Sequence, residues 1–158
     1  MKTIYLDCET TGLDPVLGSI VEIGIVDDQG VAIVDSLVNP ERRILQGAIN
    51  VHHITNEMVQ DAPTREQILP QIVEACKGKK VVIYNAPFDL SFLSEVEEVA
   101  KEICCCMLPF AEHYQEWSDY YNGWKWQKLG VAAEYVNHPI GDAHRAVDDA
   151  RACRAVWR

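Results

Sequence analysis

The segment Val81-Val82-Ile83-Tyr84 is a continuous apolar run, which is typical of a β-strand buried on both faces in the middle of a sheet. The hydrophobic period becomes helical over residues 88–100, and residues 103–106 then form a second short apolar run. A strand, a helix and a strand in this order indicate a parallel crossover connection. This part of the chain therefore predicts an α/β fold with two parallel strands.

The N-terminal part of the chain predicts three further strands. Residues 3–9 alternate side-chain types with a period of two, and residues 20–26 and 31–38 are two more β-rich stretches. The polar segment 27–30 between the last two ends in glycine, which favours a hairpin turn. We therefore expect a mixed five-stranded sheet, in which three antiparallel strands are followed by two parallel strands, flanked by helices.

Helix-start signals predict where the helices lie. Residues 64–67 (Thr-Arg-Glu-Gln) form a capping box, and the helix that follows contains Pro70 and closes at Gly78. Thr55 also resembles the N-cap of a helix. The other helical segments are expected from residue 42, over part of 108–124 together with an aromatic loop, over 125–135 and over 143–157.

The length of 158 residues is close to that of one domain, so we expect a single domain over residues 1–158. No apolar run reaches the roughly 18 residues of a membrane span, and the N-terminus has no apolar stretch of the kind a signal peptide needs. The six cysteines show no paired spacing that favours zinc and no secretory context that favours disulfides. These features predict a cytoplasmic protein that does not contact a membrane.

Acidic residues gather at the predicted carboxyl ends of the strands. Asp7 and Glu9 are two residues apart on one strand, so both carboxylates point to the same face. Asp89 follows the end of the buried strand 81–84. Because open α/β sheets place their sites at this edge, we expect the three carboxylates to converge there. Taken singly, Asp7 and Glu9 also fit a solvated strand end, and Asp89 fits a first-turn acid that favours a helix dipole.

The last helix carries a fourth acid. Asp149 shares a helical stripe with Ala146 and Cys153 and faces the protein, whereas Asp148 lies beside Arg151 and faces outward. An inward carboxylate needs a partner. Four hard oxygen donors without a cluster of soft ligands suit magnesium or manganese, and four carboxylates suit two such ions about 4 Å apart.

Three motifs resemble those of a known family. Asp7-x-Glu9-Thr10-Thr11-Gly12, Asn85-Ala86-x-Phe88-Asp89 and His144-x4-Asp149 resemble, in this order, the exonuclease motifs of the DEDDh family. The segment Val51-His52-His53-Ile54-Thr55 resembles the family's Val-His-Gly-Ile-Thr segment, with His53 in place of glycine. The resemblance covers nearly the whole chain. It implies a ribonuclease H-like fold and metal-dependent 3′ to 5′ removal of nucleoside monophosphates.

The resemblance also implies roles for individual residues. Asp7, Glu9, Asp89 and Asp149 would hold two Mg²⁺ or Mn²⁺ ions, and His144 would be the general base, because imidazole titrates near neutrality. Contacts with the substrate are implied for Thr10, Thr11, Gly12, Leu13, His52, Asn85 and Phe88. Leu13 and Phe88 fit a packing role equally well, and the departure at His53 affects the loop that carries His52.

The net charge of −10 bears on how such an enzyme would hold nucleic acid. It argues against binding through a broad basic surface. An enzyme that processes a single-stranded end needs only a few phosphate contacts, and bound metal ions add positive charge that the formal count omits. The candidate contacts also fit solvated charge or core; they are Arg42, Arg43, Lys125, Lys128, Arg145 and the aromatic residues of 114–126.

The resemblance implies a metal-dependent 3′ to 5′ exonuclease that hydrolyses the 3′-terminal phosphodiester of nucleic acid and releases nucleoside 5′-monophosphates, and we favour a single-stranded DNA end as its substrate. An RNA-trimming enzyme or oligoribonuclease of the same fold remains an alternative, as does a non-catalytic nucleic-acid-binding or interaction module. No motif acid is lost, which disfavours the non-catalytic hypothesis. Since the family includes a proofreading subunit, a polymerase or another protein partner is a further expectation.

Overall fold

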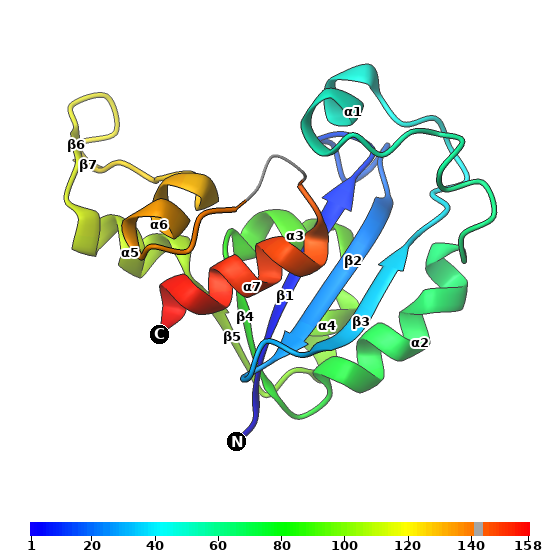
Figure 1. Cartoon of the computed structure of the whole chain (residues 1–158), viewed down its shortest axis with the longest axis horizontal. Helices are drawn as coiled ribbons and strands as arrows, with labels where there is room; N and C mark the ends of the chain where they lie inside the picture. The colour runs from blue at the N-terminus through cyan, green and yellow to red at the C-terminus, as the bar shows by residue number, and fades with distance from the viewer. Residues whose placement is uncertain (141–143) are drawn as a thin grey trace.

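A computed structural model describes residues 1–140 and 144–158 of the chain (Figure 1). Five strands form one sheet in the order β3-β2-β1-β4-β5. Their bounds are β1 Thr3–Thr10, β2 Ile20–Asp27, β3 Ala32–Leu37, β4 Lys80–Ile83 and β5 Glu102–Cys105. The pairs β1–β2 and β2–β3 are antiparallel, whereas β1–β4 and β4–β5 are parallel. The predicted mixed sheet is confirmed, and β1 is its central strand.

Helices cover both faces of this sheet. Their bounds are α1 Gln46–His52, α2 Arg65–Cys76, α3 Ala86–Phe92, α4 Glu95–Val99, α5 Met107–Tyr114, α6 Leu129–Tyr135 and α7 Ala146–Trp157. Apolar side chains of α2, α3 and α4 form one core on one face, and those of α5, α6 and α7 form a second core on the other. Successive side chains of β1 point to opposite faces of the sheet, so Ile4 and Leu6 pack in the first core and Tyr5 packs in the second. The layers are therefore helix, sheet and helix.

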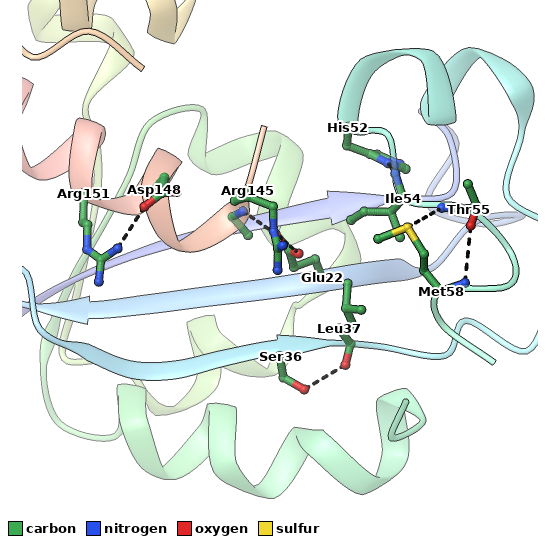
Figure 2. Close-up of polar contacts among 11 residues, drawn as sticks. Glu22, Ser36, Leu37, His52, Ile54, Thr55, Met58, Arg145, Asp148 and Arg151 are labelled. Carbon is green, nitrogen blue, oxygen red and sulfur yellow. Dashed lines mark hydrogen bonds and ion pairs between the residues drawn. The ribbon is translucent and has the colours of Figure 1, made fainter. Parts of the chain in front are cut away.

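Several helix predictions need correction. The helix expected from residue 42 begins only at Gln46, as α1. The helical stretch over 88–100 is divided into α3 and α4. No helix begins at Thr55 in the described residues: its hydroxyl accepts a hydrogen bond from the Met58 N–H at 3.3 Å, as an N-cap would, but only turns follow (Figure 2). The side chain of the neighbouring Asn56 accepts a hydrogen bond from the Ile44 N–H, and this tertiary contact holds the segment as a loop. The capping box at Thr64 is confirmed, with both of its hydrogen bonds formed.

The aromatic region contains a hairpin that the sequence analysis did not predict. Strands β6 (Trp117–Ser118) and β7 (Gly123–Trp124) pair antiparallel and form a separate small sheet. The Lys125 N–H donates to the Glu116 carbonyl, so the hairpin continues past β7 and α6 begins only at Leu129 rather than at 125. The last helix begins at Ala146, and the predicted start at residue 143 lies outside the described residues.

Helices long and apolar enough to cross a membrane are absent from the described part of the chain.

Candidate metal centre and substrate groove

Three of the four predicted ligands form a cluster at the carboxyl end of β1. Oxygen atoms of Asp7, Glu9 and Asp149 all lie within 4.8 Å of one another. Asp7 and Glu9 come from β1, and Asp149 comes from the first turn of α7, which packs across β1 and β2 (Figure 1). The sheet register and the docking of one helix therefore bring together side chains that are about 140 residues apart in the sequence.

Asp89 lies beside this cluster and is tied to β1. It is buried on α3, and its Oδ1 accepts hydrogen bonds from the N–H of Cys8 at 3.0 Å and from the Cys8 thiol at 3.3 Å. Cys8 stands between Asp7 and Glu9 in the strand, so these bonds hold the Asp89 carboxylate against the same strand end. Among the described residues Asp89 is not part of the three-residue group, but its charge acts on Asp7.

The four carboxyl groups share an environment that disfavours their charged forms. Burial, followed by repulsion from neighbouring carboxylates, raises the pKa of Asp7 well above its usual range and that of Glu9 to about 8. Burial is also the main cause that raises the pKa of Asp89 to about 7 and that of Asp149 to about 6. Asp149 Oδ1 is buried and finds no hydrogen-bond partner among the described residues. A divalent cation would satisfy this oxygen and neutralise the repulsion, and hard oxygen donors of this kind fit Mg²⁺ or Mn²⁺.

His144 lies at the edge of the carboxylate cluster. It precedes α7 by two residues, and its Nδ1 is 3.8 Å from Asp149 Oδ2. About half of its side chain, 49%, is exposed to solvent. The imidazole therefore stands between the acidic cluster and the solvent.

The helical-face prediction for the adjacent acids is confirmed. Asp149 is buried, whereas Asp148 is exposed and forms an ion pair of 2.8 Å with Arg151 on the outer face of α7 (Figure 2). The two side chains thus point in different directions, and only Asp149 belongs to the cluster.

A mostly apolar groove of about 560 Å³ lies next to Glu9, between the end of β1 and α1. Five of the predicted substrate contacts line it, namely Thr10, Gly12, Leu13, His52 and Phe88. Leu45 and Val51 of the α1 region complete its apolar wall. Phe88 also contacts Phe92, with ring centroids 5.3 Å apart, so it serves both the groove and the core.

Thr11 and Asn85 are placed differently. Thr11 is buried, and its hydroxyl accepts a hydrogen bond from the Ser19 N–H, so it fastens the loop that follows β1. Asn85 is the half-buried N-cap residue of α3, two residues after the end of β4. Neither residue lines the groove as formed by the described part of the chain, and their contacts with substrate stay predictions.

Both ring nitrogens of His52, which lines the groove, form hydrogen bonds with the backbone. Nδ1 accepts a hydrogen bond from the Ile54 N–H at 3.0 Å, so the proton lies on Nε2, which donates to the Thr10 carbonyl at 2.9 Å. Burial lowers the pKa of His52, which favours this neutral form. Figure 2 shows the ring turned toward this strand end. A contact between His52 and the substrate stays a prediction.

His53 adopts the left-handed backbone conformation that ends α1, with φ of 59°. This conformation favours glycine, so the substitution at this position of the resembling segment carries a conformational cost. We expect His53→Gly to raise the free energy of unfolding by about 1 kcal/mol. Urea unfolding followed by circular dichroism measures this change. Asn50→Gly, in the exposed interior of the same helix, is the matched control and should lower stability; a loss of stability with both variants would contradict the strain at His53.

Two residues of β2 hold the start of α7 against the sheet. Neither was predicted from the sequence as a functional residue. Glu22 is fully buried, accepts a hydrogen bond from the Ala146 N–H and pairs with Arg145 at 2.9 Å (Figure 2). Gly24, directly opposite Asp7 in the sheet, lies so close to α7 that a Cβ atom there would overlap the backbone of Ala146 and Val147. The sequence signal for these two positions is a charged residue and a glycine inside an apolar strand. A buried charge needs a partner, and a glycine in a strand often marks the close approach of another backbone.

Comparison with known proteins identifies related sequences. The sequence model of the family RNase_T, described as exonuclease, matches residues 4–156. The PolC-type DNA polymerase III of Caldanaerobacter subterraneus is 33% identical over 98% of this chain, and the uncharacterized exonuclease CP81 of Escherichia phage 186 is 33% identical over 94% of it. The chain spans 11% of the length of the polymerase and 82% of the phage protein.

Among solved structures, exonuclease X in complex with 5′ overhanging duplex DNA is similar to this chain, with a TM-score of 0.69 and 28% identity. The similarity covers 98% of this chain and 87% of that chain. The match over nearly the full length agrees with the ribonuclease H-like fold predicted from the motifs.

Proposed function

Because the chain belongs to the RNase_T exonuclease family, we propose that it hydrolyses the 3′-terminal phosphodiester of single-stranded DNA and releases nucleoside 5′-monophosphates. The observation that carries this proposal is the cluster of Asp7, Glu9 and Asp149 beside the groove at Glu9. An exonuclease needs its cleavage site next to a groove that binds the terminal nucleotide of the nucleic acid.

In this proposal Asp7, Glu9, Asp89 and Asp149 hold two divalent cations, Mg²⁺ or Mn²⁺. Bound cations of this kind orient the scissile phosphate, lower the pKa of the attacking water and stabilise the charge on the leaving 3′ oxygen. The carboxylates provide the negative charge that retains the cations, and the bonds from Cys8 to Asp89 Oδ1 fix the orientation of one of them.

His144 is proposed to accept the proton of the attacking water. Its Nδ1 faces Asp149, which leaves Nε2 as the atom that receives the proton. Its half-exposed position lets the imidazole return the proton to solvent after each cycle.

The groove is proposed to hold the 3′-terminal nucleoside. Phe88, Leu45 and Val51 offer an apolar surface for the base, and the hollow of about 560 Å³ has the size of a small-ligand site. A volume of this size suits one nucleotide rather than a base pair, which supports a single-stranded end. The relative named as a DNA polymerase supports DNA over RNA and a polymerase as partner, and exonuclease X was also solved with DNA, in that case a duplex with a 5′ overhang.

Matched DNA and RNA oligonucleotides labelled at the 5′ end test this function. With Mg²⁺ we expect a ladder of DNA products shortened one nucleotide at a time from the 3′ end, and no products in EDTA. Internal cleavage, shortening from the 5′ end or hydrolysis in EDTA would overturn the proposal. Faster digestion of the RNA would keep the reaction and reassign the substrate.

Replacing His144 with alanine is expected to lower kcat by about 10² to 10⁴, because a general base contributes on this order. The acid limb of the pH profile should disappear with it. Single-turnover hydrolysis across pH measures both effects. His138→Ala, an exposed histidine of the segment between α6 and α7, is the matched control. Normal turnover of the His144 variant with the same acid limb would show that another group takes the proton.

The stability of the metal-free protein should depend on pH. The folded-state pKa values of Glu9, Asp89 and Asp149, about 8, 7 and 6, lie above those of the unfolded chain. The native state therefore binds more protons, and stability present in full near pH 4 is lost as pH rises through these values.

In EDTA we accordingly expect Tm to fall as the pH rises from about 4 to about 8. Mg²⁺ should raise Tm more at the higher pH, because it binds the deprotonated carboxylates. Differential scanning fluorimetry measures both trends, and Glu9→Gln should make the fall less steep. A Tm that rises with pH over this interval in EDTA would contradict the assigned environment.

A further inference from the structure

The hairpin β6–β7 exposes an unusual number of aromatic side chains. Tyr120 is 88% exposed, Tyr121 73%, Trp126 64% and Trp117 52%. Rings of this size bury a large apolar area when they find a partner, and a group of exposed rings on one short segment marks a binding surface. The proposed catalytic steps use none of these residues.

Local contacts hold the hairpin in a defined shape. Trp117 and Trp124 contact each other edge to face across the two strands, with ring centroids 5.5 Å apart. Lys125 pairs with Glu116 at 2.8 Å and so closes the base of the hairpin. The result is a hollow of about 570 Å³ lined by Tyr121, Gly123, Trp124, Lys125 and Trp126. Its walls are aromatic, and its single charged group is already paired.

The hairpin stands on the same edge of the sheet as the carboxylates. The Tyr84 hydroxyl, directly after β4, donates to the carbonyl of Gln127 at 2.8 Å and fastens the end of the hairpin segment there. In Figure 1 the hairpin lies at the upper left, α1 lies at the upper right above the end of β1, and the start of α7 lies between them. If the 3′ nucleoside fills the groove by α1 and its phosphate lies at the carboxylates, a strand that extends along this edge of the sheet leads toward the hairpin.

We propose that the hollow in the β6–β7 hairpin binds a base of the substrate strand upstream of the scissile bond by stacking on Trp126 and Tyr121. This inference rests on the proposed function, which fixes the direction of the strand. Bases stack on aromatic rings whatever their sequence. Since Lys125 is neutralised by Glu116, stacking rather than charge supplies the affinity. This mode of binding accounts for how a chain of net charge −10 holds a long strand.

Binding of single-stranded DNA in a hydrolysis-deficient background tests the proposal. All proteins carry Asp149→Asn, and fluorescence anisotropy follows a labelled oligo-dT of about 15 nucleotides, a length near the upper end of single-strand site sizes. Trp126→Ala should weaken binding about tenfold, and Trp126→Phe, which keeps a ring, should restore most of it. Val31→Ala is the matched control, because this exposed apolar side chain lies just before β3 and does not line the hollow. The loss caused by Trp126→Ala should be the same at low and high salt.

Failure of this proposal and failure of the proposed function give different results. The parent chain with an intact Asp149 should hydrolyse the p-nitrophenyl ester of thymidine 5′-monophosphate with Mg²⁺, since this substrate is too short to reach the hairpin. No hydrolysis of the ester would overturn the proposed function. Equal binding of the long strand by Trp126→Ala and its parent would overturn the stacking site and leave the rings as a surface for a protein partner. A loss that disappears at high salt would overturn stacking in favour of charge.

Discussion

Replacing Asp149 with asparagine is expected to lower metal-dependent hydrolysis by about 10³-fold or more, whereas Asp148→Asn should keep most of the activity. Asp149 is buried in the cluster with Asp7 and Glu9, and its Oδ1 finds no other partner among the described residues. Asp148 points outward to Arg151 and contributes an exposed helical ion pair worth a few tenths of a kcal/mol. Both substitutions remove one negative charge, so a difference in activity between the two variants reports the position of the lost carboxylate and not the change in net charge.

Metal binding should likewise be weakened by Asp149→Asn and kept by Asp148→Asn. Saturating Mg²⁺ or Mn²⁺ is expected to raise the Tm of the parent and of Asp148→Asn, and to raise that of Asp149→Asn much less. Asp7→Ala should behave like Asp149→Asn and fold without metal, because it also relieves repulsion among the carboxylates. An inactive Asp148→Asn beside an active Asp149→Asn would show that the wrong acid had been assigned to the metal centre.

Gly24→Ala should be the most destabilising small substitution in the sheet, with a loss of about 3 kcal/mol or more. The added Cβ would overlap the backbone of Ala146 and Val147, and backbone cannot rotate away as a side chain can. The start of α7 must then lift from β2, which carries Asp149 away from Asp7. We therefore expect a lower Tm together with a smaller stabilisation by Mg²⁺, both measured by thermal unfolding.

Gly130→Ala is the matched control for this substitution. Gly130 lies in α6, where an added Cβ meets no atom within 4 Å among the described residues, so helix propensity should make the change neutral or stabilising by up to about 1 kcal/mol. If Gly24→Ala were as stable as the parent, the close seating of α7 on β2 would be wrong.

The periodic parts of the chain were predictable because burial dictates their pattern. Residues 3–9 alternate because the two faces of this strand meet different cores, residues 81–84 are continuously apolar because both faces of their strand are buried, and Asp149 lies on the buried stripe of α7. The helix predicted from Thr55 is wrong because an N-cap signal is local, whereas the tertiary hydrogen bond between Ile44 and Asn56 decides the conformation of that segment.

The same distinction applies to the candidate site. The acids could be placed from the sequence because Asp7 and Glu9 share one face of a strand and Asp149 shares the inward stripe of a helix, and their binding of a cation stays a prediction. The roles of Glu22 and Gly24 depend on where α7 docks, a contact across more than 120 residues that no local pattern contains. The hairpin β6–β7 has strands of two residues, too short for any alternation to appear.

Hydrolysis in ¹⁸O-labelled water tests the central claim most directly, because it reports the bond cleaved, the nucleophile and the need for metal together. Mass spectrometry of the mononucleotides released from oligo-dT should find nucleoside 5′-monophosphates that carry one ¹⁸O in the phosphate, formed with Mg²⁺ and absent in EDTA or with Asp149→Asn. Release of 3′-monophosphates, unlabelled phosphate or equal product in EDTA would contradict a metal-dependent attack of water at the 3′-terminal phosphodiester.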